Sequence, residues 1–132
     1  VSDANYGISD VSLARYNTDG SLDTSFDTDG KLTTSFGTGT DYATAIAIQA
    51  DGKIVAAGHV YDANYGISDF ALASYNTDGS LDPSFDTDGK LTTSIGANTD
   101  IAYAMALQSN GKIVAAGSSY NGADYDFALV RY

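Results

Sequence analysis

Residues 41–58 read Asp-Tyr-Ala-Thr-Ala-Ile-Ala-Ile-Gln-Ala-Asp-Gly-Lys-Ile-Val-Ala-Ala-Gly, and a close copy of this stretch occupies residues 100–117. Two short apolar runs flank the Asp-Gly pair at 51–52, and Asp-Gly is among the strongest short-range signals for a β-hairpin. The copy has Asn-Gly at 110–111, which is the other preferred pair. The stretch therefore predicts two antiparallel strands joined by a tight turn, once in each copy.

The two stretches belong to a repeat that covers the whole chain. When residues 1–59 are aligned with residues 60–118, 44 of the 59 positions are identical. A third copy begins at Ser119 and runs to Tyr132, with two residues fewer in its loop. A period of this length is typical of stacked supersecondary units, none of which buries its apolar face alone.

The complete repeat predicts four strands. After the hairpin, a polar loop from His59 to Ser68 leads into run 69–75, which has apolar residues on both faces. Such a strand is expected between two other sheets. The last run, 90–95, is rich in Thr and half polar, as outer strands are. Four antiparallel strands in each repeat of 59 residues predict an all-β fold made of β-propeller blades. A parallel β-helix is the alternative, but its coils are shorter and lack such hairpins.

The first strand of the repeat is expected to lie closest to the propeller axis. Small and large residues alternate along run 43–49, which places alanines on one face and Ile46 and Ile48 on the other. The alanines make the strand narrow enough for blades that converge. We expect the isoleucines in the core between sheets, together with recurring tyrosines such as Tyr16, Tyr75 and Tyr132.

The chain divides unevenly among the predicted blades. Residues 1–40 supply the third and fourth strands of one blade, residues 41–99 a complete blade, and residues 100–132 the first three strands of another. Propellers have four or more blades, and open sheet edges pair readily with other strands. We therefore expect partners that are further copies of the chain, forming a ring or a filament, or adjacent repeats of a longer chain.

The composition restricts the class of protein further. All 17 acidic residues are Asp, the net charge is −11, and Cys is absent. Asp is more typical of turns than of helices, and the negative charge disfavours nucleic acids and anionic membranes as partners. No apolar run approaches the roughly 18 residues of a membrane helix, and no signal peptide is recognised. Many Ser, Thr, Asn, Gly and Tyr residues favour an extracellular or cell-surface bacterial protein.

Several segments together resemble a known family. Segments 52–58 (Gly-Lys-Ile-Val-Ala-Ala-Gly), 69–72 (Asp-Phe-Ala-Leu), 75–82 (Tyr-Asn-Thr-Asp-Gly-Ser-Leu-Asp) and 84–85 (Ser-Phe) are similar to the bacterial delta-60 repeat, and the likeness extends over all three copies. The resemblance implies a β-propeller and a secreted, surface-associated protein. The family has no assigned biochemical function, so the resemblance implies no catalytic residues.

The Asp-rich linker before the fourth strand is the first candidate site. Calcium takes six to eight oxygen ligands, and clustered carboxylates beside glycine turns can supply them. The spacing lacks the third ligand and the bidentate Glu of a calcium loop, so two tight turns with Asp and Asn bonded to nearby backbone are the favoured interpretation. The candidate calcium ligands are Asn17, Asp19, Asp23, Asp27 and Asp29, and one repeat later Asn76, Asp78, Asp82, Asp86 and Asp88.

A second candidate is the loop that pairs Asn with Tyr, at Asn5 and Tyr6 and again at Asn64 and Tyr65. These side chains could stack on a sugar and bond to it, which would make a glycan-binding loop. The alternative is an exposed connection whose Tyr packs on a neighbouring blade. His59 is the only histidine and is expected as a polar residue at a strand end, because a zinc site or a Ser-His pair needs more partners.

No catalytic set stands out, so we expect a protein that is not an enzyme and has no resident cofactor. The leading hypothesis is a structural or interaction module: blades of a secreted or surface bacterial β-propeller that associate with further copies. A glycan- or calcium-binding module that uses the repeated loops is the alternative.

Overall fold

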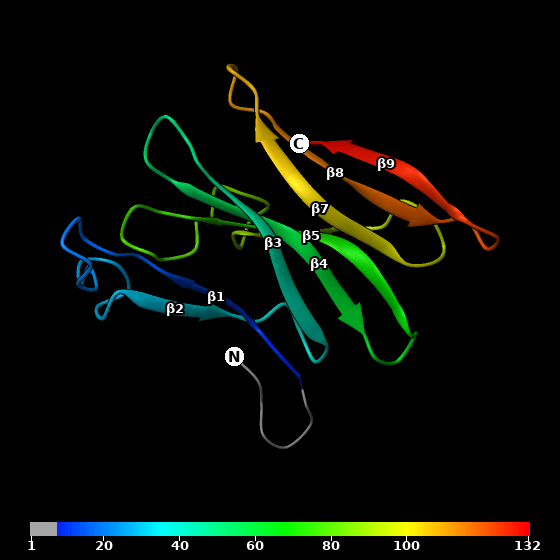
Figure 1. Ribbon diagram of the computed structural model, residues 1–132, viewed down its shortest axis with the longest axis horizontal. Coiled ribbons are helices and arrows are strands. Elements are labelled where there is room, and N and C mark those ends of the chain that lie inside the picture. Colours follow the sequence, from blue (N-terminus) through cyan, green and yellow to red (C-terminus); the bar gives the residue numbers. More distant parts are fainter. Residues whose placement is uncertain (1–7) are drawn as a thin grey trace.

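The computed structural model describes residues 8–132, and in this range the chain forms nine β-strands and no helix. The predicted all-β class is confirmed. The strands form three antiparallel sheets that follow one another in chain order (Figure 1). No segment of the described range is a helix long and apolar enough to cross a membrane. The first sheet holds β1 (Val11–Ala14) and β2 (Lys31–Thr34); the second holds β3 (Thr40–Ile48), β4 (Ile54–Asp62), β5 (Ile67–Tyr75) and β6 (Lys90–Thr93); the third holds β7 (Asp100–Leu107), β8 (Ile113–Tyr120) and β9 (Tyr125–Arg131).

The second sheet has the strand order β3-β4-β5-β6, so each strand pairs with its neighbour in the chain. Gly52 closes the β3–β4 hairpin with a φ of +86°, a conformation that glycine adopts without a Cβ clash. The strands extend further than the sequence predicts, because β4 and β5 remain paired as far as Asp62 and Ile67. The predicted loop from His59 to Ser68 is therefore a four-residue turn. His59 lies inside β4 rather than at a strand end, so that expectation was wrong.

A β-bulge interrupts the first strand of the second sheet. The register of β3 against β4 shifts between Ala43 and Ala45, which leaves Thr44 as the extra residue. The Thr44 hydroxyl donates to the Ala102 carbonyl oxygen of β7 at 2.8 Å, and so joins the second sheet to the third. Opposite the bulge, a Cβ on Gly58 would lie 1.8 Å from the Tyr42 carbonyl oxygen, so this close approach requires glycine.

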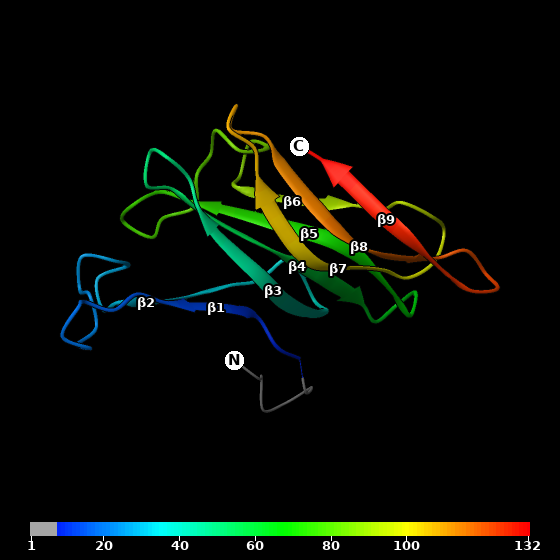
Figure 2. The same cartoon turned by 45° about the horizontal axis from the view of Figure 1, so that its top comes forward.

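The sheets pack face to face (Figure 2). Apolar side chains fill the space between them. Between the first and second sheets lie Phe26, Leu32, Ile54 and Tyr75. Between the second and third sheets lie side chains of β4, β5, β7, β8 and β9, including Val55, Leu72 and Ile113 in one cluster and Phe70, Ala102 and Ala128 in another. The two central strands, β4 and β5, are thus covered on both faces, as the apolar residues on both faces of run 69–75 predict.

One tyrosine hydroxyl crosses each junction between sheets. Tyr75 of β5 donates to the Thr34 hydroxyl of β2 at 2.8 Å. Tyr132, directly after β9, donates to the Thr93 hydroxyl of β6 at the same distance. Tyr16 occupies the equivalent position in the first copy but is 62% exposed. The prediction that Tyr16 belongs to the core was wrong, because no sheet formed by residues 8–132 lies on its side of β1 to supply the threonine.

The expected burial of Ile46 and Ile48 was also wrong, since these side chains are 60% and 70% exposed. Ile54 and Ala56 lie on the same face of the second sheet and are buried by β1 and β2. Between β1 and β3 lies an open recess rather than packed side chains, so the isoleucines of β3 stay exposed. One repeat later, Met105 and Leu107 are partly buried because the complete second sheet lies against them.

Candidate functional site

The first turn of each Asp-rich linker is built from the same hydrogen bonds. The backbone N–H and the hydroxyl of Ser21 donate to Asp19 Oδ1 at 2.9 and 2.6 Å. Ser80 donates to Asp78 Oδ1 in the same way, at 3.0 and 2.6 Å. The serine hydroxyl, and then the backbone N–H, lower the pKa of both carboxyl groups. These contacts form Asx turns, in which a short carboxylate side chain replaces a backbone acceptor.

In the second turn of each linker, an Asp carboxylate forms an ion pair with a Lys or Arg side chain. Lys53 Nζ lies 2.7 Å from Asp82 Oδ2, and the Ser84 hydroxyl and N–H bind the other oxygen of that carboxylate. The hydrogen bond from Lys53, followed by that from Ser84, lowers the pKa of Asp82 to about 2. In the first linker, Asp23 Oδ2 accepts instead from Arg15 Nε at 2.8 Å. The two carboxylates therefore pair with cationic side chains from different positions of the repeat, because Lys53 directly precedes β4 whereas Arg15 directly follows β1.

The third turn of each linker is strained in both copies. Asp27 and Thr28 have φ values of +46° and +65°, and Asp86 and Thr87 have +44° and +68°. For a β-branched threonine this left-handed conformation is unfavourable, and it persists only where the surroundings hold it. The next carboxylate in each copy accepts a backbone N–H: Asp29 from Lys31 at 3.0 Å and Asp88 from Lys90 at 2.9 Å.

Most of the ten predicted calcium ligands thus have a protein partner in the structure. Asn17 and Asn76 each donate their side-chain amide to a serine hydroxyl at 3.0 Å. Within residues 8–132, no group of three or more His, Cys, Asp or Glu residues is arranged so that it could hold a metal ion. The hydrogen bonds of the linkers are those of tight turns, and calcium binding stays a prediction.

Only half of the predicted glycan loop can be described. Asn5 and Tyr6 lie outside the described residues. Asn64 lies in the turn between β4 and β5, where its backbone N–H donates to Asp62 Oδ1 at 2.8 Å. Tyr65 beside it is 77% exposed, so its ring does not pack deeply on a neighbouring sheet.

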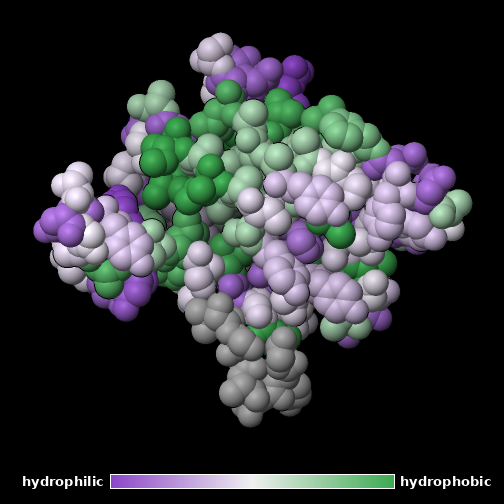
Figure 3. All heavy atoms as spheres, in the orientation of Figure 1, coloured by the Kyte–Doolittle hydropathy of each residue, from purple (hydrophilic) through white to green (hydrophobic). Residues whose placement is uncertain are grey.

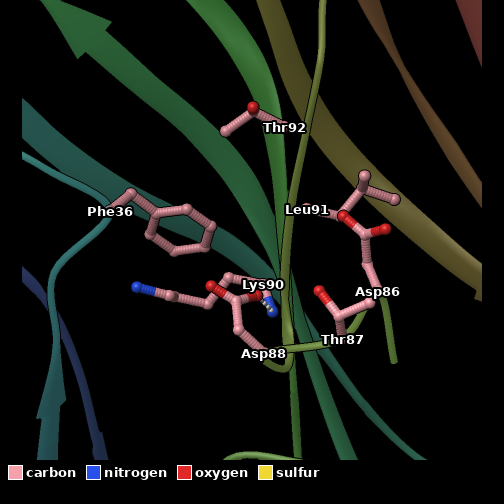
Figure 4. A pocket seen from close by; sticks show the side chains of 7 residues that line it. All are labelled: Phe36, Asp86, Thr87, Asp88, Lys90, Leu91 and Thr92. Atoms are coloured by element: carbon pink, nitrogen blue, oxygen red, sulfur yellow. Dashed lines mark hydrogen bonds between the residues drawn. The ribbon is translucent and has the colours of Figure 1, made fainter. Parts of the chain in front are cut away.

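A hollow of about 290 Å³ lies where the first and second sheets meet at their outer edge. Lys90 Nζ lies 5.8 Å from the centre of the Phe36 ring and donates to the Ser35 carbonyl oxygen at 3.1 Å. Figure 4 shows Lys90 reaching toward the Phe36 side, with Asp86 and Leu91 across from it. Sequence reasoning missed this hollow, because Phe36 and Lys90 come from different repeats and meet only through stacking.

Two buried carboxylates fix the connections that enter the second and third sheets. Asp41 is 3% exposed, and its Oδ2 accepts the Phe36 N–H at 2.7 Å. Asp100 is fully buried, and its Oδ2 accepts the Ile95 N–H at 2.7 Å. Burial raises the pKa of Asp41. These carboxylates hold the chain as it passes from one sheet to the next.

Two apolar surfaces remain uncovered at the ends of the stack. The first, which we call the β3 groove, is a recess of about 390 Å³ between β1 and β3, where Leu13, Ala14, Ala45 and Ile46 contribute to the lining. Ile48 continues the apolar strip along β3. Figure 3 shows hydrophobic side chains gathered on the side of the molecule where β3 and β7 lie.

The second surface, the β9 face, carries the outward side chains of β9. Phe127 is 80% exposed and Leu129 is 60% exposed. Their equivalents in the second sheet, Phe70 and Leu72, are completely buried because the third sheet covers them. Equivalent Phe and Leu side chains of the repeat are thus buried where a further sheet packs on them and exposed where no described sheet does.

A comparison with protein families agrees with the stacked sheets. A family model described as a domain of unknown function (DUF5122) beta-propeller matches residues 2–26, 49–85 and 108–132. None of the curated proteins compared with the chain matches it. Because the family model matches more than half of the chain, and the described residues form stacked antiparallel sheets, the chain belongs to the DUF5122 β-propeller family.

Proposed function

We propose that the chain is a non-enzymatic interaction module, whose blades associate with further blades to complete a β-propeller. Its repeat is of the delta-60 type, and the protein is secreted or surface-associated in a bacterium. A closed ring of copies is favoured over a filament, because propeller blades pack with a constant angular step. Head-to-tail contacts that close form a ring, and those that do not close form a filament.

The observation that carries this proposal is the contrast between equivalent side chains. Phe70 and Leu72 are fully buried between two sheets, whereas Phe127 and Leu129 face solvent. Large apolar side chains in such a cluster are typical of protein interaction sites. The β3 groove offers a matching apolar surface at the other end of the stack. A head-to-tail contact would bring the β9 face of one copy against the second sheet of the next.

The proposal is tested by sedimentation velocity on the parent chain and two variants. Leu129→Asp introduces a charge on the β9 face without disturbing a buried position, and we expect it to abolish association. Tyr65→Asp adds the same charge at another exposed aromatic residue and serves as the control. Association that survives Leu129→Asp as well as it survives Tyr65→Asp would contradict the proposal.

A second candidate function is glycan binding through the β4–β5 turn, which the 77% exposure of Tyr65 beside Asn64 favours. Calcium binding by the Asp-rich linkers is the other form of this alternative. If either alternative holds, Tyr65→Ala abolishes retention on immobilised glycans, or millimolar calcium raises the melting temperature by several degrees in a manner that a chelator reverses.

A further inference from the structure

We infer that, when two copies associate, β9 of one copy replaces β1 of the other and pairs with that copy's β2. The inference rests on the proposed function and identifies β1 as the strand that is displaced. The exchange completes a sheet of β7, β8 and β9 from one copy and β2 from the next. That sheet has the same strand order as the second sheet, β3-β4-β5-β6.

The exchange removes the one strand that a simple head-to-tail contact between two copies would hold in excess. Both β1 and β9 correspond to β5, as residues 13–16 (Leu-Ala-Arg-Tyr) and 129–132 (Leu-Val-Arg-Tyr) show beside 72–75 (Leu-Ala-Ser-Tyr). The two end copies even share an arginine where the middle copy has Ser74. Only one of these equivalent strands can lie between β8 and β2.

The strand β1 is the shorter of the two, and its release breaks fewer strand-to-strand pairs, together with the contact of Arg15 with Asp23. It pairs with β2 over four residues, and of its side chains Val11 and Leu13 face the second sheet, while Ala14 points outward and is exposed. By contrast, β9 pairs with β8 over its whole length from Tyr125 to Arg131. Release of β9 would uncover the buried Ala128 and break the hydrogen bond from Tyr132 to Thr93.

The incoming strand fits the place that β1 leaves. In the second sheet, Phe70 lies opposite Thr93 and Leu72 opposite Leu91. The same register would place Phe127 opposite Thr34 and Leu129 opposite Leu32 of the second copy. Two side chains that are now mostly exposed would become buried, as Phe70 and Leu72 are.

The neighbouring strands would fill the β3 groove at the same time. With β9 beside β2, strands β7 and β8 of one copy would lie over β3 of the other. Ile46 and Ile48 would then be covered, as Met105 and Leu107 are by the second sheet. A second copy therefore matches both uncovered surfaces in one docking step.

Charge complementarity supports the same arrangement. Lys53 at the start of β4 binds Asp82 in the linker of its own sheet at 2.7 Å. Lys112 is its equivalent before β8 and is exposed. In the completed sheet, Lys112 would reach Asp23 of the second copy. Asp23 is the equivalent of Asp82 and is held by Arg15 in the separate chain.

A disulfide lock tests the release of β1 in the full chain, which has no native cysteine. Ser12 lies opposite Thr33. Because Arg15 N–H donates to the Gly30 carbonyl oxygen, the alternation of the ladder makes Ser12 and Thr33 a non-hydrogen-bonded pair, in which the Cα atoms are close enough for a disulfide. We expect Ser12→Cys/Thr33→Cys to be monomeric when oxidised and to associate like the parent when reduced.

The matched control is Ala71→Cys/Thr92→Cys, which locks the equivalent pair of β5 and β6. These strands do not exchange, so this variant should associate in both redox states. A third variant, Thr33→Cys/Ala128→Cys, places cysteines on the strands that are proposed to meet. We expect oxidation to link this variant into covalent oligomers on a non-reducing gel.

The outcomes separate the two proposals. If Ser12→Cys/Thr33→Cys associates when oxidised as well as when reduced, and Thr33→Cys/Ala128→Cys forms no covalent oligomers, the strand exchange is overturned but the interaction module stays in place. A parent chain that remains monomeric at high micromolar concentration would overturn both.

Discussion

Single residues show how the repeat reuses one conformation in two settings. Gly20 and Gly79 have φ values of +87° and +93°. A Cβ on Gly20 would meet nothing within 4 Å, whereas a Cβ on Gly79 would lie 2.9 Å from the Asp27 backbone nitrogen. That nitrogen donates to the Asp78 carbonyl oxygen at 2.7 Å, which joins the two linkers. Gly79 therefore serves both the turn and the junction between repeats.

We predict that Gly79→Ala destabilises the chain more than Gly20→Ala. Both substitutions force an L residue into the left-handed region, which costs about 1–2 kcal/mol. Only Gly79→Ala also disturbs the contact between linkers, which adds about 1 kcal/mol for a weakened hydrogen bond. Urea unfolding of the two variants measures the difference. Equal losses would mean that the linkers do not stabilise each other.

The pair of Lys53 and Asp82 predicts a pH-dependent stability. The folded-state pKa of Asp82 is about 2, below its usual 3.8, so its contribution is present above pH 4 and is lost as the pH falls from 4 through 2. Asp82→Asn keeps the acceptor for Ser84 but removes the charge that binds Lys53. We expect the variant to melt below the parent at pH 7.

At pH 2, the melting temperatures of the parent and Asp82→Asn should approach each other, because the parent carboxylate is then about half protonated. Thermal melts at pH 7, 4 and 2 give the comparison. A difference in melting temperature that is the same at all three pH values would show that the ion pair contributes nothing.

At the scale of elements, the strands follow from short-range chemistry. The Asp-Gly pair and the alternating runs predict the β3–β4 hairpin, and the structure has it. The bulge at Thr44 and the continued pairing to Asp62 were not predictable, because backbone hydrogen bonds between strands decide both. The Asx turns of the linkers follow from Asp spaced two residues before Ser, as at Asp19 and Ser21.

The exposure of β3 gives a matched pair of substitutions. Ile48 is exposed, whereas its equivalent Leu107 packs against the second sheet. We predict that Ile48→Asp leaves the melting temperature of the separate chain almost unchanged. Leu107→Asp should lower it strongly, since a partly buried charge without a partner is costly.

Thermal melts of both variants at a concentration where the parent is dissociated test this pair. Equal destabilisation by the two substitutions would show that β3 is covered in solution. No effect from either would show that the cluster formed by Leu107 and Val55 does not stabilise the fold.

At the scale of the whole molecule, the hollow beside Phe36 and the β3 groove form only where one sheet packs against the next, so the sequence alone does not predict them. The hollow beside Phe36 needs Lys90 from the next repeat. The β3 groove exists because the first sheet has two described strands and the second has four. Repeat periodicity predicts which side chains face a neighbouring sheet, but whether that neighbour is present depends on how many strands each sheet receives.

The same count sets the size of the proposed assembly. If β9 takes the place of β1, each chain supplies two complete blades to a ring. Propellers have four to eight blades, so a ring would contain two, three or four chains. The number of blades in such a ring must be even.

The most direct test of this account is the molar mass of the parent chain in solution, measured by light scattering during size-exclusion chromatography at micromolar concentration. The account predicts one species with a mass of two, three or four times the 13.7 kDa of the chain. A compact species of 13.7 kDa that persists as the concentration rises would contradict it.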